Sequence, residues 1–125
     1  MGTRSQDKPL FWIGSTLDDV RRFPDDIKRT MGFALRRAQN GRKHVDAKPL
    51  KGFGGAGVLE IVEDDDGNTY RAVYTVKFAE AVYVLHAFQK KATKGISTPR
   101  HEMDLIKERL KRAEEHYGEW QRKQE

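Results

Sequence analysis

Three consecutive segments rich in Val, Ile and Tyr constrain the fold of this chain more than any other feature. They span residues 58–63, 69–76 and 81–89, and short polar turns at 65–68 and 77–80 separate them. β-branched and aromatic residues favour strands, and connections this short join antiparallel neighbours rather than parallel ones. The sequence therefore predicts a three-stranded antiparallel meander.

Helical patterns lie on both sides of this meander. Ser15 is a candidate N-cap for a short first helix, and Pro24 followed by two aspartates begins a second helix that ends at Asn40-Gly41. Thr98-Pro99 begins a last helix in the same way, with apolar residues three and four apart. The apolar stripe of the last helix is Met103, Ile106, Leu110, Ala113 and Tyr117. We expect that stripe to pack on the sheet, although a coiled-coil or partner-binding role would use the same spacing.

The predicted order of elements is β-α-α-β-β-β-α, because residues 9–13 add a short edge strand before the helices. This order belongs to an α+β fold, an antiparallel sheet with a helical hairpin on one face and a C-terminal helix. Residues 1–8 form a predicted flexible arm and residues 9–125 a single domain, a length that can bury one core. Residues 42–57 are glycine-rich and basic, and we predict a long loop there.

Composition narrows the classes of function. Lys and Arg number 24 against 19 Asp and Glu, and the net charge of +5 favours a polyanionic partner. The chain has no cysteine, so it has no disulfide framework or thiolate metal site. Its apolar stretches are far too short to span a bilayer, so we expect no membrane partner and a cytoplasmic location.

The alternation of side chains along the predicted strands separates an apolar face from an opposite face that carries ionisable residues among valines and Phe88. The apolar face would consist of Leu59, Ile61, Tyr70, Ala72, Tyr74, Val76, Ala81, Tyr83 and Leu85. If the second turn pairs Val76 with Ala81, the opposite face carries a row of Glu60, Arg71 and His86 across three strands. This row is either a functional site or a structural salt bridge beside a surface histidine.

Other chemistry is poorly supported. The four histidines have no spacing typical of metal ligands, and the serines lie in the arm or at helix starts, where capping explains them. We therefore predict no metal and no cofactor.

Five motifs in this order resemble those of the RelE/HigB-type toxin superfamily of bacterial type II toxin–antitoxin systems, especially its phage-derived branch. The motifs are Lys48-Pro-Leu-Lys-Gly52, Leu59-Glu-Ile61, Tyr70-Arg-Ala-Val-Tyr74, Leu85-His-Ala-Phe-Gln-Lys-Lys91 and Thr98-Pro-Arg100. The resemblance implies a RelE-like fold and a metal-independent endoribonuclease that cleaves mRNA, with the ribosome as a partner. It also implies a cognate antitoxin, often a helix-turn-helix protein.

Carried over by position, the resemblance implies that Arg71 contacts the scissile phosphate and that Lys91 supplies a further cation after the last strand. The chain departs from the superfamily at two points. Leu59-Glu-Ile61 stands where RelE has Lys-x-Lys, and no Tyr or His follows Lys91 as a C-terminal catalytic residue. The proton-transfer groups are therefore sought elsewhere.

RNA cleavage without a metal needs a proton acceptor for the 2′-hydroxyl and cations that stabilise the phosphorane. We assign Arg71 and Lys91 to charge stabilisation and His86 or Glu60 to proton acceptance. The lysines expected to bind RNA are Lys48, Lys51, Lys90 and Lys94. A non-catalytic nucleic-acid or protein-binding module with the same fold is the main alternative, and a ribosome-independent ribonuclease is another.

Overall fold

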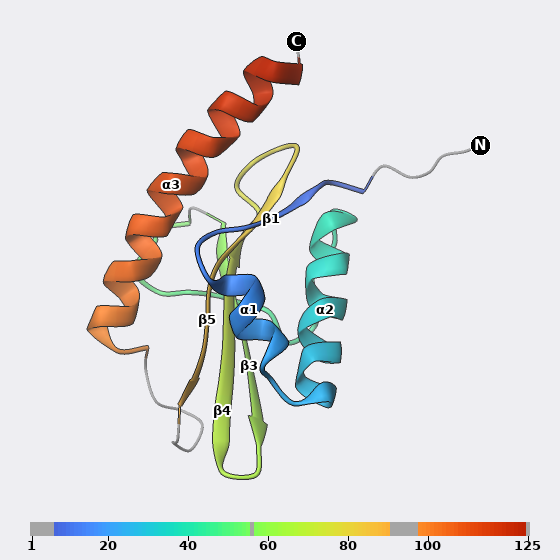
Figure 1. The fold of residues 1–125 in the computed structure, drawn as a ribbon, viewed down its shortest axis with the longest axis vertical. Helices are drawn as coiled ribbons and strands as arrows, with labels where there is room; N and C mark the ends of the chain where they lie inside the picture. Colours follow the sequence, from blue (N-terminus) through green and yellow to red (C-terminus); the bar gives the residue numbers. More distant parts are fainter. Residues whose placement is uncertain (1–6, 56, 91–97, 125) are drawn as a thin grey trace, which may run out of the picture.

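A five-stranded mixed sheet forms the centre of the computed structural model, which describes residues 7–55, 57–90 and 98–124 (Figure 1). The strands are β1 (Leu10–Trp12), β2 (Lys48–Pro49), β3 (Val58–Asp65), β4 (Asn68–Thr75) and β5 (Val82–Lys90), and their spatial order is β1-β5-β4-β3-β2. The helices are α1 (Thr16–Arg21), α2 (Asp25–Gln39) and α3 (Arg100–Gln124). The predicted α+β class and the antiparallel meander of β3, β4 and β5 are confirmed.

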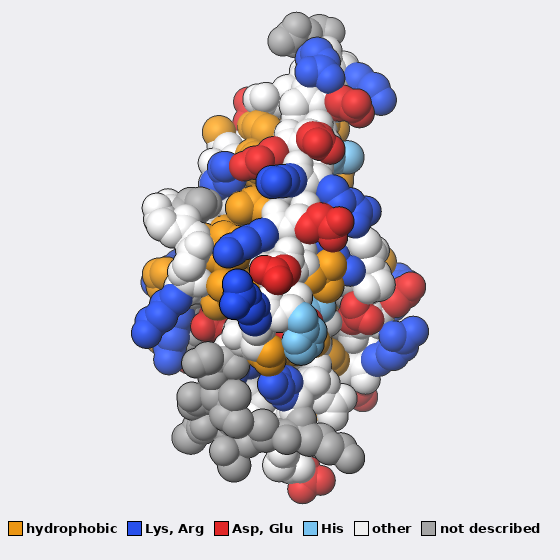
Figure 2. All heavy atoms as spheres, turned by 90° about the vertical axis from the view of Figure 1, so that its left-hand side faces the viewer, with side chains coloured by type: hydrophobic (Ala, Val, Ile, Leu, Met, Phe, Trp, Pro, Cys, Tyr) orange, Lys and Arg blue, Asp and Glu red, His pale blue; other side chains and the backbone are white. Residues whose placement is uncertain are grey.

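The helix α3 covers one face of the sheet. Every residue of its predicted stripe joins a core that also contains Val58, Val73 and Leu85 from the strands, so the sheet-packing interpretation is confirmed. The last turns of α3 extend past the sheet (Figure 1). On its outward side, Lys and Arg side chains alternate with Asp and Glu rather than gathering into a basic patch (Figure 2).

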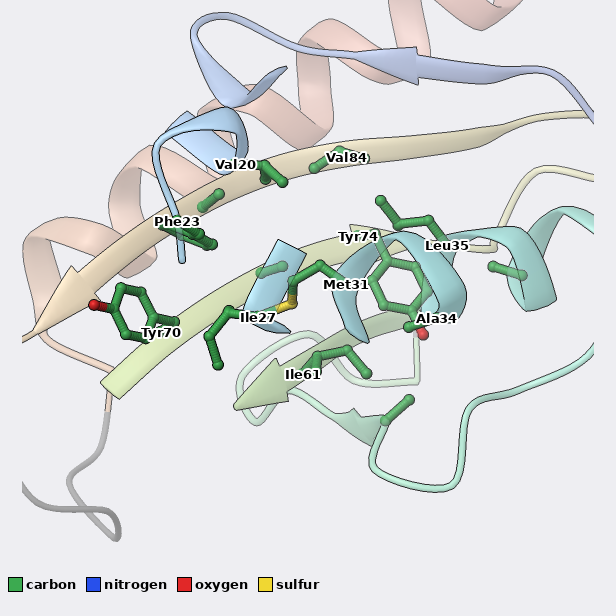
Figure 3. Packing of buried hydrophobic residues seen from close by; sticks show 14 of the residues in the cluster. Val20, Phe23, Ile27, Met31, Ala34, Leu35, Ile61, Tyr70, Tyr74 and Val84 are labelled. Carbon is green, nitrogen blue, oxygen red and sulfur yellow. The ribbon is translucent and has the colours of Figure 1, made fainter. Parts of the chain in front are cut away.

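The hairpin of α1 and α2 covers the opposite face. Five residues of α2 at helical spacing are buried, namely Ile27, Met31, Ala34, Leu35 and Ala38. They contact strand residues such as Ile61 and Tyr74, and together these side chains make an apolar core (Figure 3). Pro24 and Asn40 flank α2 as predicted. The hydroxyl of Ser15, however, bonds the carboxylate of Asp19 rather than a backbone amide of α1.

The observed pairing of β4 with β5 differs from the predicted one, and part of the difference is a β-bulge. The loop between these strands is longer than expected, so Thr75 pairs with Tyr83, and one extra residue in β5 shifts the register between Val73 and Tyr74. The extra residue is Leu85, which packs under α3 together with Ala81 and Tyr83. The prediction that Ala81, Tyr83 and Leu85 share a face with Leu59, Ile61, Tyr70, Ala72, Tyr74 and Val76 is therefore wrong.

The predicted long loop 42–57 contains a strand that the sequence did not reveal. Lys48 and Pro49 form β2, and Lys48 pairs with Glu60 at the edge of the sheet. β2 is short, so it pairs with β3 only at Leu59 and Glu60, and the backbone N–H of Leu50 extends the contact to the carbonyl of Val58 at 2.9 Å. The rest of that edge is left to form the wall of a pocket.

The predicted N-terminal arm falls partly outside the described residues. Its last residue, Lys8, donates its backbone N–H to the carbonyl of Gln39 at 3.0 Å, and its own carbonyl accepts a hydrogen bond from the side chain of Gln39 at 2.7 Å. The chain is therefore attached to the end of α2 just before β1 begins.

Candidate functional site

An open pocket of about 970 Å³ lies beside the outer edge of β3. Its walls come from β2, β3, β4, the loop before β2 and the segment that begins α3. Four residues predicted from the sequence line it together: Lys48, Lys51, Glu60 and Arg71. Three predicted cations and one predicted carboxylate thus face a common volume, together with the carboxylates of Asp46, Glu63 and Asp64.

Arg71 is the most buried charged group of the pocket, with 5% of its surface exposed. It lies in β4 between Val62 and Phe88, and strand alternation directs it to the α3 face. Its Nη1 donates to Glu60 Oε1 and to Thr98 Oγ1, each at 3.3 Å. The pairing of Arg71 with Glu60 is therefore present, but it is diagonal, because Val73 lies opposite Glu60.

The predicted row through His86 is wrong. His86 lies opposite Val73, and Phe88 lies opposite Arg71, because the longer loop and the bulge each shift β5 by one residue from the assumed register. The imidazole of His86 stacks on Phe88, with ring centroids 4.7 Å apart, and is not part of the pocket lining. Its role as a proton acceptor stays a prediction.

Two residues of α3 hold the imidazole of His86. Nε2 lies 2.6 Å from Glu102 Oε1, and Nδ1 lies 3.3 Å from Nη1 of Arg109. A guanidinium can only donate, so Nδ1 accepts and Nε2 carries the hydrogen that is donated to Glu102. Both ring nitrogens are thus engaged within the protein.

Arg109 and Glu102 were missed by the sequence analysis. Arg109 is 9% exposed, donates to the Leu85 carbonyl at 3.1 Å, and burial lowers the pKa of its guanidinium. Their spacing could have revealed them, because residues 102, 106, 109 and 113 are three or four apart and therefore lie on the same face of α3. A charged residue inside an apolar stripe indicates a buried polar contact.

The rim of the pocket also carries carboxylates. The pKa of Glu63 is raised by partial burial, by a hydrogen bond with Asp46, and by the negative charges of Asp46 and Asp64. All three line the pocket. Among the residues that the structure describes, no group of three or more His, Asp or Glu side chains is arranged to hold a metal ion.

The remaining predicted lysines lie elsewhere. Lys90 ends β5 opposite Thr69 and does not line the pocket. Lys91 and Lys94 fall outside the described residues. The structure therefore brings together half of the residues assigned from the sequence, namely Glu60, Arg71, Lys48 and Lys51.

The fold and the pocket define a small α+β domain with a pocket at a sheet edge that is lined by both cations and carboxylates. The family described as "Phage derived protein Gp49-like (DUF891)" matches residues 18–111, about three quarters of the chain, and the chain belongs to this family, which is part of the RelE/HigB-like toxin superfamily. No curated protein and no solved structure matches the chain significantly. No helix within the described ranges is long and apolar enough to cross a membrane.

Proposed function

We propose that this chain is the toxin of a type II toxin–antitoxin system, an endoribonuclease that cleaves mRNA positioned by the ribosome. One observation carries the proposal: the buried cation Arg71 shares a pocket with Lys48, Lys51 and the carboxylate of Glu60. Cations that stabilise phosphate charge, beside a group that accepts a proton, are what metal-free RNA cleavage requires. Membership of the Gp49-like family supports the same function.

In the proposed reaction the ribose 2′-hydroxyl attacks the adjacent phosphorus, and the bond from phosphorus to the 5′ oxygen breaks. Glu60 accepts the proton of the 2′-hydroxyl, and the departing oxygen takes a proton from solvent, which leaves a 2′,3′-cyclic phosphate and a 5′-hydroxyl. Arg71 stabilises the charge on the phosphorane, because a guanidinium can bond two phosphate oxygens at once. Lys91 is assigned to the same task, and Lys48 and Lys51 hold the RNA backbone.

Glu60 is a better candidate than His86 for the proton acceptor. Its carboxylate lines the pocket 3.3 Å from Arg71, so a phosphate bound by the guanidinium lies beside it. The ring nitrogens of His86 already bond Glu102 and Arg109. We assign His86 to the mechanism only if the Glu60 variant described below retains cleavage.

The same contacts of His86 favour a second candidate function, a non-catalytic nucleic-acid or protein-binding module. With its imidazole held by α3, and without a Tyr or His after Lys91, the chain would bind RNA in the pocket without cutting it. The cleavage experiment separates these two functions.

The test is cleavage of a reporter mRNA in a cell-free translation reaction, mapped by primer extension. We expect discrete cuts with the unchanged chain and a loss of 10²-fold or more for Arg71→Ala, in line with other electrostatic stabilisers. Glu60→Gln should lose activity comparably, whereas Lys107→Ala, an exposed change on α3, should have no effect.

Folding has to be separated from chemistry in this test, because Arg71 and Glu60 form a largely buried pair. Arg71→Lys keeps the charge and loses the two-pronged geometry, so it serves as the second variant, and circular dichroism establishes that each protein is folded. Full cleavage by folded Arg71→Ala would refute the site. No cleavage by the unchanged chain, with normal growth on expression, would favour the binding module.

The partners are proposals as well. A cognate antitoxin, of helix-turn-helix type by the superfamily resemblance, would neutralise the chain by covering the pocket. Hydrogen exchange in the complex should then slow in residues 42–57 and at the edge of β3. Unchanged exchange in both segments would exclude direct occlusion of the pocket.

A further inference from the structure

An exposed aromatic ring lies in the second half of α2, outside the pocket. Phe33 exposes 56% of its surface, whereas most large apolar side chains of the described chain are at least partly buried. The guanidinium of Arg37 lies 5.5 Å from its ring centroid, and the ring of His44 approaches edge-on at 5.6 Å. The ring of Phe33 is therefore held in place and remains open to solvent.

This ring is connected to the pocket by the loop that precedes β2. His44 is buried, and its Nδ1 accepts the backbone N–H of Asp46 at 3.0 Å, which fixes the loop beside α2. Between them lies Val45, which is 89% exposed and lines the pocket. A continuous surface thus runs from the pocket across residues 44–46 to Phe33.

The cations along this surface have no carboxylate partners among the described residues. Arg37, Arg42 and Lys43 form none of the ion pairs found there, in contrast to Lys28, Arg29 and Arg36, which each pair with an aspartate. Lys48 and Lys51 continue the series into the pocket. Asp46 is the one carboxylate of residues 37–51, against five Lys and Arg side chains, and an excess of positive charge attracts a polyanion.

We propose that this surface is a second RNA subsite, in which single-stranded RNA leaving the pocket crosses the loop and stacks one base on Phe33. Arg37, Arg42 and Lys43 contact its phosphates. The inference rests on the proposed function, because it assumes RNA in the pocket. An exposed aromatic ring set among cations is the arrangement that binds single strands without sequence preference.

A protein partner fits this surface less well. Phe33 and Val45 are the large apolar side chains exposed there, and two side chains surrounded by cations fall short of the contiguous apolar core of a stable protein interface. Stacking on a base needs only the one ring. The chemistry therefore favours a nucleic acid.

The test is binding of a fluorescein-labelled RNA of about 12 nucleotides by fluorescence anisotropy, a length within the usual range of single-strand sites. Complete 2′-O-methylation removes the nucleophile, so binding is measured without cleavage. Phe33→Ala should weaken binding about 5- to 100-fold, the range seen when a stacking ring is removed. Phe33→Trp should bind at least as well as the unchanged chain, whereas Phe33→Leu should resemble Phe33→Ala.

A charge pair provides the matched control. Arg37→Ala with Lys43→Ala should make the slope of log affinity against log salt less negative, by about 0.7 for each lost phosphate contact. The corresponding change of Lys107 and Lys111, which are exposed on α3, should leave the slope unchanged.

Each outcome decides between the inference and the proposed function. Equal binding by Phe33→Ala and the unchanged chain would overturn the subsite and leave the function standing, since mRNA cleavage is measured separately. Tight RNA binding by Phe33→Leu would overturn base stacking as the role of the ring. Failure of the unchanged chain to bind the RNA would also overturn the inference, whereas absence of cleavage in the translation reaction would overturn the function.

Discussion

The two faces of the sheet enclose interiors of different kinds. Under α1 and α2 the core cluster consists of apolar and aromatic side chains, and the buried titratable group beside it is His44, which packs against Phe33 of α2. Under α3 the same sheet holds three buried groups that can carry charge, Arg71, His86 and Arg109. The polar groups of this second face are bonded to each other, to a backbone carbonyl or to residues near the start of α3.

This difference indicates a division of roles between the faces. Apolar burial is the main favourable term in folding, and the hairpin face supplies it without desolvating charges. The α3 face gives up some of that gain to keep Arg71 beside a pocket. Substitutions should therefore affect mainly stability on the first face, and stability together with site geometry on the second.

The largest expected effect concerns the hairpin face. Met31 is fully buried, and Met31→Ala should lower the free energy of unfolding by about 2–5 kcal/mol, because it loses apolar contacts and leaves a cavity. Urea denaturation measures the change. Phe33→Ala, two residues along the same helix but exposed, is the matched control and should change stability by no more than about 0.5 kcal/mol. A loss below about 1 kcal/mol for Met31→Ala would show that this face is not the main source of stability.

A smaller loss is expected on the α3 face. Arg109→Met should lower the free energy of unfolding by about 1–3 kcal/mol, because the Leu85 carbonyl and His86 Nδ1 lose their donor. Arg112→Met, exposed on the same helix, provides the comparison. Combined with Glu102→Gln, the change should be non-additive by 0.5 kcal/mol or more, because both residues bond His86. Strict additivity would mean that the three side chains do not act as one network.

Tyr74 provides a test of the apolar face with a smaller expected effect. Its hydroxyl is buried without a hydrogen-bond partner among the described residues, so Tyr74→Phe should be neutral or up to about 1 kcal/mol more stable. Burial raises the pKa of Tyr74 to about 12, so the folded state resists deprotonation. Its contribution to stability is present below about pH 10 and is lost as the pH rises to about 12.

The free energy of unfolding, measured between about pH 10 and pH 12, tests whether stability falls as the pH rises. Tyr74→Phe should show a shallower alkaline loss than the unchanged chain. Part of the loss should remain, because burial and the neighbouring Tyr117 also raise the pKa of Tyr83 to about 12. An identical alkaline profile for the two proteins would contradict the burial of the Tyr74 hydroxyl.

The smallest expected effect is at the rim of the pocket. Because the pKa of Glu63 is raised in the folded state, its contribution to stability is present at acid pH and is lost as the pH rises through that pKa. Asp46→Asn removes the nearest negative charge, so it should lower the pKa of Glu63 and slightly stabilise the chain at neutral pH. NMR titration of the Glu63 carboxyl measures the shift. An unchanged pKa of Glu63 in Asp46→Asn would show that the two carboxylates do not interact.

The sequence was sufficient for the elements with strong periodicity. The stripes of α2 and α3 and the three meander strands are long enough for their pattern to identify them. The two-residue strand β2 has no period, and it forms only because Lys48 and Pro49 meet an edge already built by β3. The extra residue at Leu85 was equally hidden, since it is accommodated by packing against α3.

The part of the pocket that could be predicted is the part that residue type and strand alternation are enough to place. Arg71 and Glu60 belong to the polar face of strands next to each other, so their pairing survived an error in register elsewhere. Arg109 was not predicted, because its role depends on where α3 crosses β5. Phe33 lies outside the stripe of α2, so its exposure follows from the same periodicity, but its contact with His44 depends on where the loop before β2 packs.

The parallel pairing of β1 with β5 determines when during synthesis the fold can be completed. β1 is made before the other described strands but has its sheet partner in residues 82–84, and α3, which covers the site face, is made after β5. Contacts between segments so distant in the sequence form late and slow the folding of a domain. A nascent chain that already exposes Arg71 therefore still lacks the strand β5 and the contact from Thr98 that set its position. The order of translation itself delays assembly of the site until β5 and the start of α3 have been made.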